Sequence, residues 1–131
     1  MSGQGRQYWR ERRRAHRLAR RIIHFLSNDL DYVIRLERLT PKRLHELGHN
    51  PRVVLAGCVD EPNWTIHVDF RFDVILTVAH EVLHILYEDA PEEAILKMEE
   101  CLKEHLTNQQ AVKIWYYSAL CMTRAWIGPT D

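Results

Sequence analysis

Two stretches of the sequence each place two histidines four residues apart, with a glutamate directly after the first. LHELGHNPRV contains the pair His45 and His49, and VAHEVLHILY contains the pair His80 and His84. On a continuous helix, positions i and i+4 share one face, so two imidazoles can bind one metal ion while the carboxylate lies beside it. Either match therefore predicts half of a zinc site if its helix continues through both histidines and is largely apolar around them.

The first match has helix-ending residues inside and after it. Gly48 lies between the two histidines and Pro51 follows them, and proline disfavours helical conformation in the residue before it. We therefore predict a surface helix of about two turns that begins after Thr40 and ends at Gly48. His49 then lies past the end of this helix, where it cannot share a face with His45.

The second match lies within VILTVAHEVLHIL, which is apolar on both sides of the histidines and contains neither glycine nor proline. We predict a helix over 73–87 that presents His80 and His84 to one Zn²⁺ ion, because neutral imidazole is a preferred zinc ligand. Glu81 is predicted to be the catalytic residue, accepting a proton from the water that the metal activates and passing it to the leaving amine. The alternative is a pair of core histidines, which would cost free energy if they were left without partners.

The segment TVAHEVLHIL at 77–86 resembles the active-site helix of the zincin superfamily of HExxH metallopeptidases. Thr77 stands three positions before the first histidine, uncharged residues lie between the key positions, and an apolar pair follows the second histidine. The resemblance covers about residues 77–95 and implies zinc-dependent hydrolysis of a peptide or protein substrate. It also implies that the strand before this helix, residues 64–70, is an edge strand that binds the substrate in extended form.

A catalytic zinc usually has three protein ligands, so the two histidines need a third. The metzincin continuation is absent, because Tyr87 and Ala90 occupy the positions of its glycine and its histidine. The chain is instead most similar to minimal gluzincins, small bacterial, archaeal and phage-type proteins in which a glutamate of the next helix completes the site.

The short connection EDAP joins the motif helix to a predicted helix over 90–106. An antiparallel neighbour after so short a loop places its first turn beside the last turn of the motif helix, so we predict Glu92 as the third metal ligand. Three alternatives stay open: Glu93, His105 as in the SprT-like proteases, and a capping box from Asp89 in which Glu92 only closes the helix start.

The sequence leaves two supporting roles undecided. A phenol could stabilise the oxyanion that forms during peptide hydrolysis, and the candidates are Tyr87, Tyr116 and Tyr117. A carboxylate could orient a ligand imidazole through a hydrogen bond, and the candidates are Asp73, Glu88 and Asp89.

The N-terminal segment carries a concentrated positive charge. Residues 1–21 contain eight arginines and one glutamate, whereas the whole chain has no net charge. Apolar residues recur at helical spacing within a predicted amphipathic helix over about 6–26, at Ala15, Leu18, Ala19, Ile22 and Leu26. We favour a docked helix with a solvated basic face. The alternative is a nucleic-acid-binding or regulatory protein with a structural or degenerate zincin core, in which the backbone contacts come from Arg10, Arg12, Arg13 and Arg14.

The remaining patterns predict one α+β domain over 1–131, with a small, about three-stranded sheet backed by helices. DYVIRLERL alternates as a strand, RVVLAGCV and WTIHVDFR flank the turn DEPN, and a last helix runs from a Thr107–Gln110 capping box to Gly128-Pro129. No apolar run reaches the roughly 20 residues that cross a bilayer. Three scattered cysteines and the lack of a signal-peptide pattern lead us to expect a cytoplasmic protein, and the oligomeric state stays open.

Overall fold

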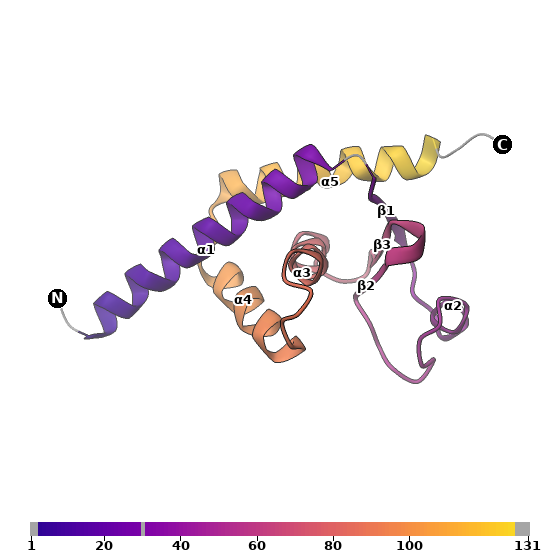
Figure 1. The fold of residues 1–131 in the computed structure, drawn as a ribbon, viewed down its shortest axis with the longest axis horizontal. Coiled ribbons are helices and arrows are strands. Elements are labelled where there is room, and N and C mark those ends of the chain that lie inside the picture. The colour runs from indigo at the N-terminus through magenta and orange to yellow at the C-terminus, as the bar shows by residue number, and fades with distance from the viewer. Residues whose placement is uncertain (1–2, 30, 128–131) are drawn as a thin grey trace.

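The computed structural model describes residues 3–29 and 31–127, with the side chains of 125–127 left out. It confirms an α+β architecture with five helices and a small mixed sheet (Figure 1). The elements in chain order are α1 (Gly3–Asn28), β1 (Val33–Glu37), α2 (Pro41–Glu46), β2 (Gly57–Asp60), a 3₁₀ turn (Glu61–Asn63), β3 (Thr65–Asp69), α3 (Val74–Leu86), α4 (Glu92–His105) and α5 (Asn108–Ile127). No helix in the described ranges is long and apolar enough to cross a membrane.

The three strands pair in the order β1-β3-β2. β1 runs parallel to β3, with Val33 opposite Thr65, and β2 runs antiparallel to β3, with Gly57 opposite Val68. β3 is therefore the central strand, with both of its edges hydrogen-bonded. The antiparallel pairing of β2 with β3 agrees with the two strands expected on either side of the turn DEPN, but the expectation that residues 64–70 form a free edge is wrong, because β1 pairs with the other edge of β3.

Side chains on the two faces of the sheet meet different surroundings. Ile34, Ile66 and Val68 point into the main apolar core, which α1, α3 and α5 complete. The other face carries His67, which contacts Glu37 and lies near α2 through the Glu37–Arg43 ion pair. Because both faces are covered, every residue of β3 is buried, polar ones included.

α1 is longer than predicted, with 26 residues that span about 39 Å at 1.5 Å per residue. Its five buried residues are the five that the apolar pattern identified, Ala15, Leu18, Ala19, Ile22 and Leu26. This stripe packs against α4 and α5, and the first turns of α1 extend beyond the rest of the fold (Figure 1). The docked amphipathic helix is therefore confirmed.

The helix starts follow local signals in the sequence. At the start of α5, the Thr107 hydroxyl accepts from the Gln110 backbone and the Gln110 side chain accepts from the Thr107 backbone, as a capping box requires. The predicted end of this helix at Gly128-Pro129 lies outside the described residues. α3 is capped by Asp73, whose carboxylate accepts a hydrogen bond from the Leu76 backbone amide at 3.0 Å.

Candidate metal centre

The helix that carries the second match continues through both histidines. α3 has 13 residues, and Val78, Val82 and Leu83 around the two histidines are buried. The His80 side chain is 14% exposed and the His84 side chain 30% exposed, so both line the rim of the core at the surface. Their ring centroids lie 4.8 Å apart, as i and i+4 positions of one helix require.

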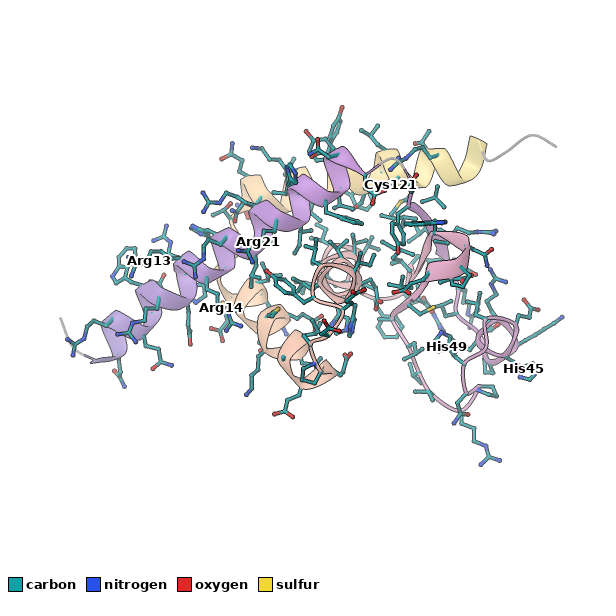
Figure 2. All side chains as sticks on the ribbon, in the orientation of Figure 1. Arg13, Arg14, Arg21, His45, His49 and Cys121 are labelled. Atoms are coloured by element: carbon teal, nitrogen blue, oxygen red, sulfur yellow. The ribbon has the colours of Figure 1, made fainter. Side chains whose placement is uncertain are left out.

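In the first match, no helix continues through both histidines. α2 ends at Glu46, and Gly48 adopts a φ of +84°, which reverses the chain. The Gly48 and His49 backbone amides donate to the carbonyls of His45 and Leu44, the hydrogen-bond pattern of a Schellman helix end. His49 therefore lies outside the helix, and Figure 2 shows it on a different side of α2 from the exposed His45.

Glu92 converges on the second pair of histidines. Its Oε1 lies 2.9 Å from His80 Nε2, and its Oε2 lies 2.6 Å from His84 Nε2. The two Nε2 atoms are themselves 3.1 Å apart. Two imidazole nitrogens and a carboxylate thus face one point, and they form a group whose ligand atoms all lie within 4.8 Å of one another.

This donor set suits Zn²⁺. Zinc–nitrogen bonds of 2.0–2.1 Å in tetrahedral geometry imply ligand atoms about 3.3 Å apart, close to the 3.1 Å between the two Nε2 atoms. The ligand types, two neutral nitrogens and one carboxylate oxygen, match those of catalytic zinc sites, which keep one position for water or substrate. Glu92 is 57% exposed at its side chain, so this corner of the site opens to solvent.

The start of α4 shows where Glu92 lies relative to its possible partners. Pro91 occupies the cap position and no side chain caps the helix, so the predicted Asp89 capping box does not form. Glu92 is the first residue of α4 and reaches the histidines. Glu93 is exposed, and within the described residues it forms no hydrogen bond or ion pair with either histidine.

His105 lies at the opposite end of α4, about 20 Å from Glu92 along the helix axis. Its Nε2 lies 3.8 Å from carboxylate oxygens of Glu11 and Glu104, the second group in the described chain with metal-ligand types close together. His105 therefore does not join His80 and His84, and the three-histidine alternative does not match this geometry.

A carboxylate that the sequence analysis did not assign supports the site from behind. Glu99 Oε2 lies 3.2 Å from His80 Nδ1, the ring nitrogen that points away from Glu92. Such a hydrogen bond sets the ring orientation and the tautomer of an imidazole ligand. The candidates proposed for this role were Asp73, Glu88 and Asp89, and Asp73 instead caps α3. The signal was the seven-residue spacing from Glu92 to Glu99, which returns to the same helix face after two turns.

The two helices meet in opposite senses. Glu92 at the start of α4 meets His84 near the end of α3, whereas Glu99, two turns later, meets His80. Figure 1 views α3 nearly along its axis and α4 more from the side, so the helices cross instead of lying strictly antiparallel. The crossing lets one helix face supply both a candidate ligand and its supporting carboxylate.

Glu81 is the most deeply buried ionisable group of the site, at 7% exposure. Burial raises the pKa of Glu81 to about 7, with the negative charges of Glu92 and Glu99 adding to the rise and His80 opposing it. Within the described residues its carboxylate has neither a hydrogen bond nor an ion pair, so it is free to bind water or substrate. Burial and the Glu81 charge likewise raise the pKa of Cys58, on β2, to about 11.

β2 passes very close to Glu81. A Cβ atom on Gly57 would lie 2.7 Å from Thr77 Cγ2 and 3.4 Å from Glu81 Cγ. Only glycine therefore allows the strand to approach the first turns of α3 so closely. β2 therefore lies directly beside the Glu81 side chain.

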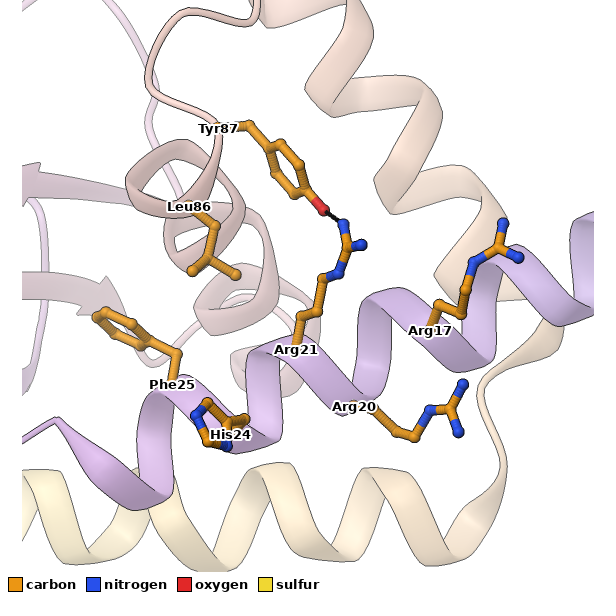
Figure 3. A pocket seen from close by; sticks show the side chains of 7 residues that line it. All are labelled: Arg17, Arg20, Arg21, His24, Phe25, Leu86 and Tyr87. Atoms are coloured by element: carbon orange, nitrogen blue, oxygen red, sulfur yellow. Dashed lines mark hydrogen bonds between the residues drawn. The ribbon is translucent and has the colours of Figure 1, made fainter.

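The tyrosine candidates differ in their surroundings. The Tyr87 hydroxyl accepts a hydrogen bond from Arg21, so the Tyr87 side chain points toward α1 (Figure 3). Tyr116 is exposed on α5 and Tyr117 packs against the core. Within the described chain, none of the three forms a hydrogen bond or ring contact with His80 or His84.

A second polar cluster, which includes Glu37, His67 and Asp69, lies on the face of the sheet that points away from the main apolar core. Glu37 accepts from Arg43 Nε and from His67 Nδ1, both at 2.6 Å, and these partners lower the pKa of Glu37 against the opposing effect of burial. Asp69 is fully buried and accepts from the Leu39 and Arg71 backbones. The Arg71 side chain holds the pKa of Asp69 at about 2.

In comparisons with known proteins, no family model, curated protein or solved structure matches this chain.

Proposed function

We propose that this protein is a zinc-dependent metallopeptidase of the gluzincin type, with α3 as the active-site helix and α4 as the glutamate helix. The observation that carries the proposal is the convergence of Glu92 on His80 and His84, with the unpaired carboxylate of Glu81 one residue from the first of them. His80, His84 and Glu92 would hold the metal. Bound zinc would supply a Lewis acid that polarises the peptide carbonyl and acidifies a water molecule.

Glu81 and Glu99 have separate roles in the proposed reaction. Glu81 accepts a proton from the attacking water and donates it to the amine nitrogen of the leaving peptide, so it ends the cycle in the state in which it began. Glu99 keeps His80 oriented through its hydrogen bond to Nδ1. The burial of Glu81 limits competing solvent contact at the carboxylate.

The extended substrate is proposed to lie along β2. β3 is central in the sheet, and β2 is the edge strand that contacts α3 beside Glu81 at Gly57. Addition of an extended peptide to an edge strand supplies backbone hydrogen bonds without dependence on substrate sequence. The role that the resemblance implies for residues 64–70 therefore moves to residues 57–60.

The decisive experiment compares Glu81→Gln with Glu46→Gln, the same change at the equivalent position of the other match. Zinc content and hydrolysis of casein and of a fluorogenic peptide library are measured for both variants and the wild type. Glu81→Gln should keep the metal and lose about 10²–10⁴-fold in rate, the usual contribution of a general base. Glu46→Gln should match the wild type.

Two results would contradict the proposal. A zinc-loaded wild type that cleaves none of the peptides would remove the peptidase function while leaving metal binding intact. Full activity of zinc-loaded Glu81→Gln would instead overturn the assignment of Glu81.

A further inference from the structure

The arginines of α1 form a regular line on its outer side. Arg6, Arg10, Arg13, Arg17 and Arg20, followed by His24, repeat at steps of four and three residues. At 100° per residue, this line is centred about 180° from the buried stripe of Ala15, Leu18, Ala19, Ile22 and Leu26. All six side chains are exposed, and we call them the arginine stripe. It extends about 27 Å along the helix, with one positive group every 5 Å or so.

The charge of this stripe is not neutralised by the protein itself. Among the described residues, ion pairs of arginine occur only at Arg43 and Arg71, so no arginine of the stripe is paired with a carboxylate. Glu11, the one acidic residue of the segment, lies about 140° around the helix from the stripe and faces His105. Five unpaired cations in a row repel one another, and a polyanion would relieve that repulsion.

An aromatic ring lies beside the arginines near the start of the helix. Trp9 is 44% exposed, and together with Arg6, Arg10 and Arg13 it lines a surface hollow of ≈ 400 Å³. Arg12 stacks over the same indole, with its guanidinium carbon 5.1 Å from the ring centroid. The hollow thus combines a flat π surface with three phosphate-binding groups, the combination with which proteins hold unpaired bases.

The other end of the stripe borders a larger hollow. Arg17, Arg20 and His24 line a depression of ≈ 700 Å³ whose far wall is formed by Leu86 and Tyr87 at the end of α3 (Figure 3). Arg21, beside the stripe, donates a hydrogen bond to the Tyr87 hydroxyl. This contact connects α1 to the end of α3. A chain bound along the stripe would therefore pass from Trp9 to this hollow.

We infer that α1 binds a single-stranded polynucleotide, with its phosphates along the arginine stripe and a base stacked on Trp9. This inference does not rest on the proposed peptidase function. It reverses the preference for a purely solvated face that the sequence alone favoured, and it replaces Arg12 and Arg14 with stripe residues. Arg12 stacks on Trp9, and Arg14 lies to the side of the stripe.

A single strand fits these features better than two other polyanions. An anionic membrane surface is bound by helices that insert an apolar face, whereas the apolar face of α1 is buried in the core. An acidic protein would supply charge but no base for the exposed indole. A line of cations beside an aromatic platform matches a polymer that repeats both a phosphate and a base.

The test uses the full chain and fluorescein-labelled 20-mers of single-stranded DNA and RNA, with fluorescence anisotropy followed from 50 to 300 mM salt. Five phosphate contacts predict a slope of log affinity against log salt of about −3.5, at roughly −0.7 per contact. Arg10→Gln/Arg13→Gln/Arg17→Gln should weaken binding at least 10-fold and reduce the slope by about 2. Trp9→Ala should weaken binding about 5-fold with little change in slope.

The matched control removes the same charge elsewhere. Arg35, Arg38 and Arg52 are exposed outside α1, and their triple change to Gln should leave affinity within about 2-fold of the wild type. Circular dichroism of each variant verifies that the fold is intact. Binding of either 20-mer with this pattern supports the inference.

Several outcomes would overturn it. One is failure of the wild type to bind either 20-mer at 50 mM salt, and another is a loss of affinity in the control variant as large as that in the stripe variant. A third is tighter binding of duplex DNA than of the single strands, with no effect of Trp9→Ala. The last is binding of polyglutamate, or of vesicles of phosphatidylserine and phosphatidylcholine, as tight as that of the oligonucleotides.

Discussion

The regions around His45–His49 and His80–His84 share one four-residue spacing and little else. In the first, the helix ends at Glu46 and a left-handed glycine turns the chain before the second histidine. In the second, 13 residues of uninterrupted helix carry both imidazoles to the same place. The difference teaches that the spacing is informative only where the backbone holds both positions in one helical conformation.

The two regions also differ in what surrounds them. Glu46 forms an ion pair with Arg43. Within the described chain, His45 and His49 belong to no group of three metal-ligand side chains. His80 and His84 face Glu92, and Glu99 lies behind His80. A neighbouring helix, which neither motif contains, is therefore what distinguishes a candidate metal centre from a helix end.

The largest expected effect separates the two histidine pairs directly. His80→Ala or His84→Ala should weaken zinc binding on the order of 10³-fold, because each removes one of three protein ligands. His45→Ala and His49→Ala should bind zinc as the wild type does. Metal analysis and competition with a chelator measure both sets, and zinc loss only in the 45/49 variants would reverse the contrast.

A second difference lies in the response to acid, because the α2 side of the sheet is held by charged groups. The pKa of Asp69, at about 2, lies below its ordinary value of 3.8, so its interactions stabilise the fold above about pH 4 and are lost as the pH falls through about 2. The shift corresponds to about 2 kcal/mol.

Urea unfolding at pH 5, 3 and 2 tests this expectation. The difference in unfolding free energy between the wild type and Asp69→Asn should shrink by about 2 kcal/mol from pH 5 to pH 2. A difference that stays constant over this range would show that Asp69 stabilises the fold by packing alone.

The glycines of the two regions should respond differently to alanine. Gly57→Ala forces a Cβ against Thr77 and the His67 carbonyl, so it should destabilise the fold by about 1–3 kcal/mol and displace Glu81. Gly48→Ala meets no atom within 4 Å and bears only the strain of its positive φ, about 1 kcal/mol. Thermal unfolding compares them, and equal losses would place the α3–β2 contact in doubt.

A smaller effect on metal binding is expected for the third donor. Glu92→Gln should weaken zinc binding by about 10-fold, or 1.4 kcal/mol, because a poor neutral ligand replaces a carboxylate. Glu93→Gln, one residue further on and exposed, serves as the matched control and should stay within 2-fold of the wild type. Release of zinc by the Glu93 variant alone would mean that α4 is rotated by about 100° relative to this structure.

Local signals in the sequence predicted much of this fold. The helical spacing of apolar residues predicted the buried stripe of α1. The Thr107–Gln110 capping box predicted the start of α5, and Gly48 predicted the end of α2. These features depend on contacts between residues at most a few turns apart, so the sequence contains all of their determinants. The strand order was not predictable in this way, because parallel pairing of β1 with β3 depends on residues about 30 positions apart.

The candidate site also combines features determined by the local sequence with features determined by the tertiary structure. The sequence by itself determined that His80, Glu81 and His84 share one helix, because helical geometry follows from local composition. Only the tertiary structure decided that Glu92 meets both imidazoles, that Glu99 supports His80 and that β2 passes beside Glu81. These contacts depend on the angle at which α4 crosses α3 and on the absence of a side chain at Gly57. The crossing angle is set by the packing of the whole core, and the need for glycine at position 57 arises only because that packing brings β2 against α3.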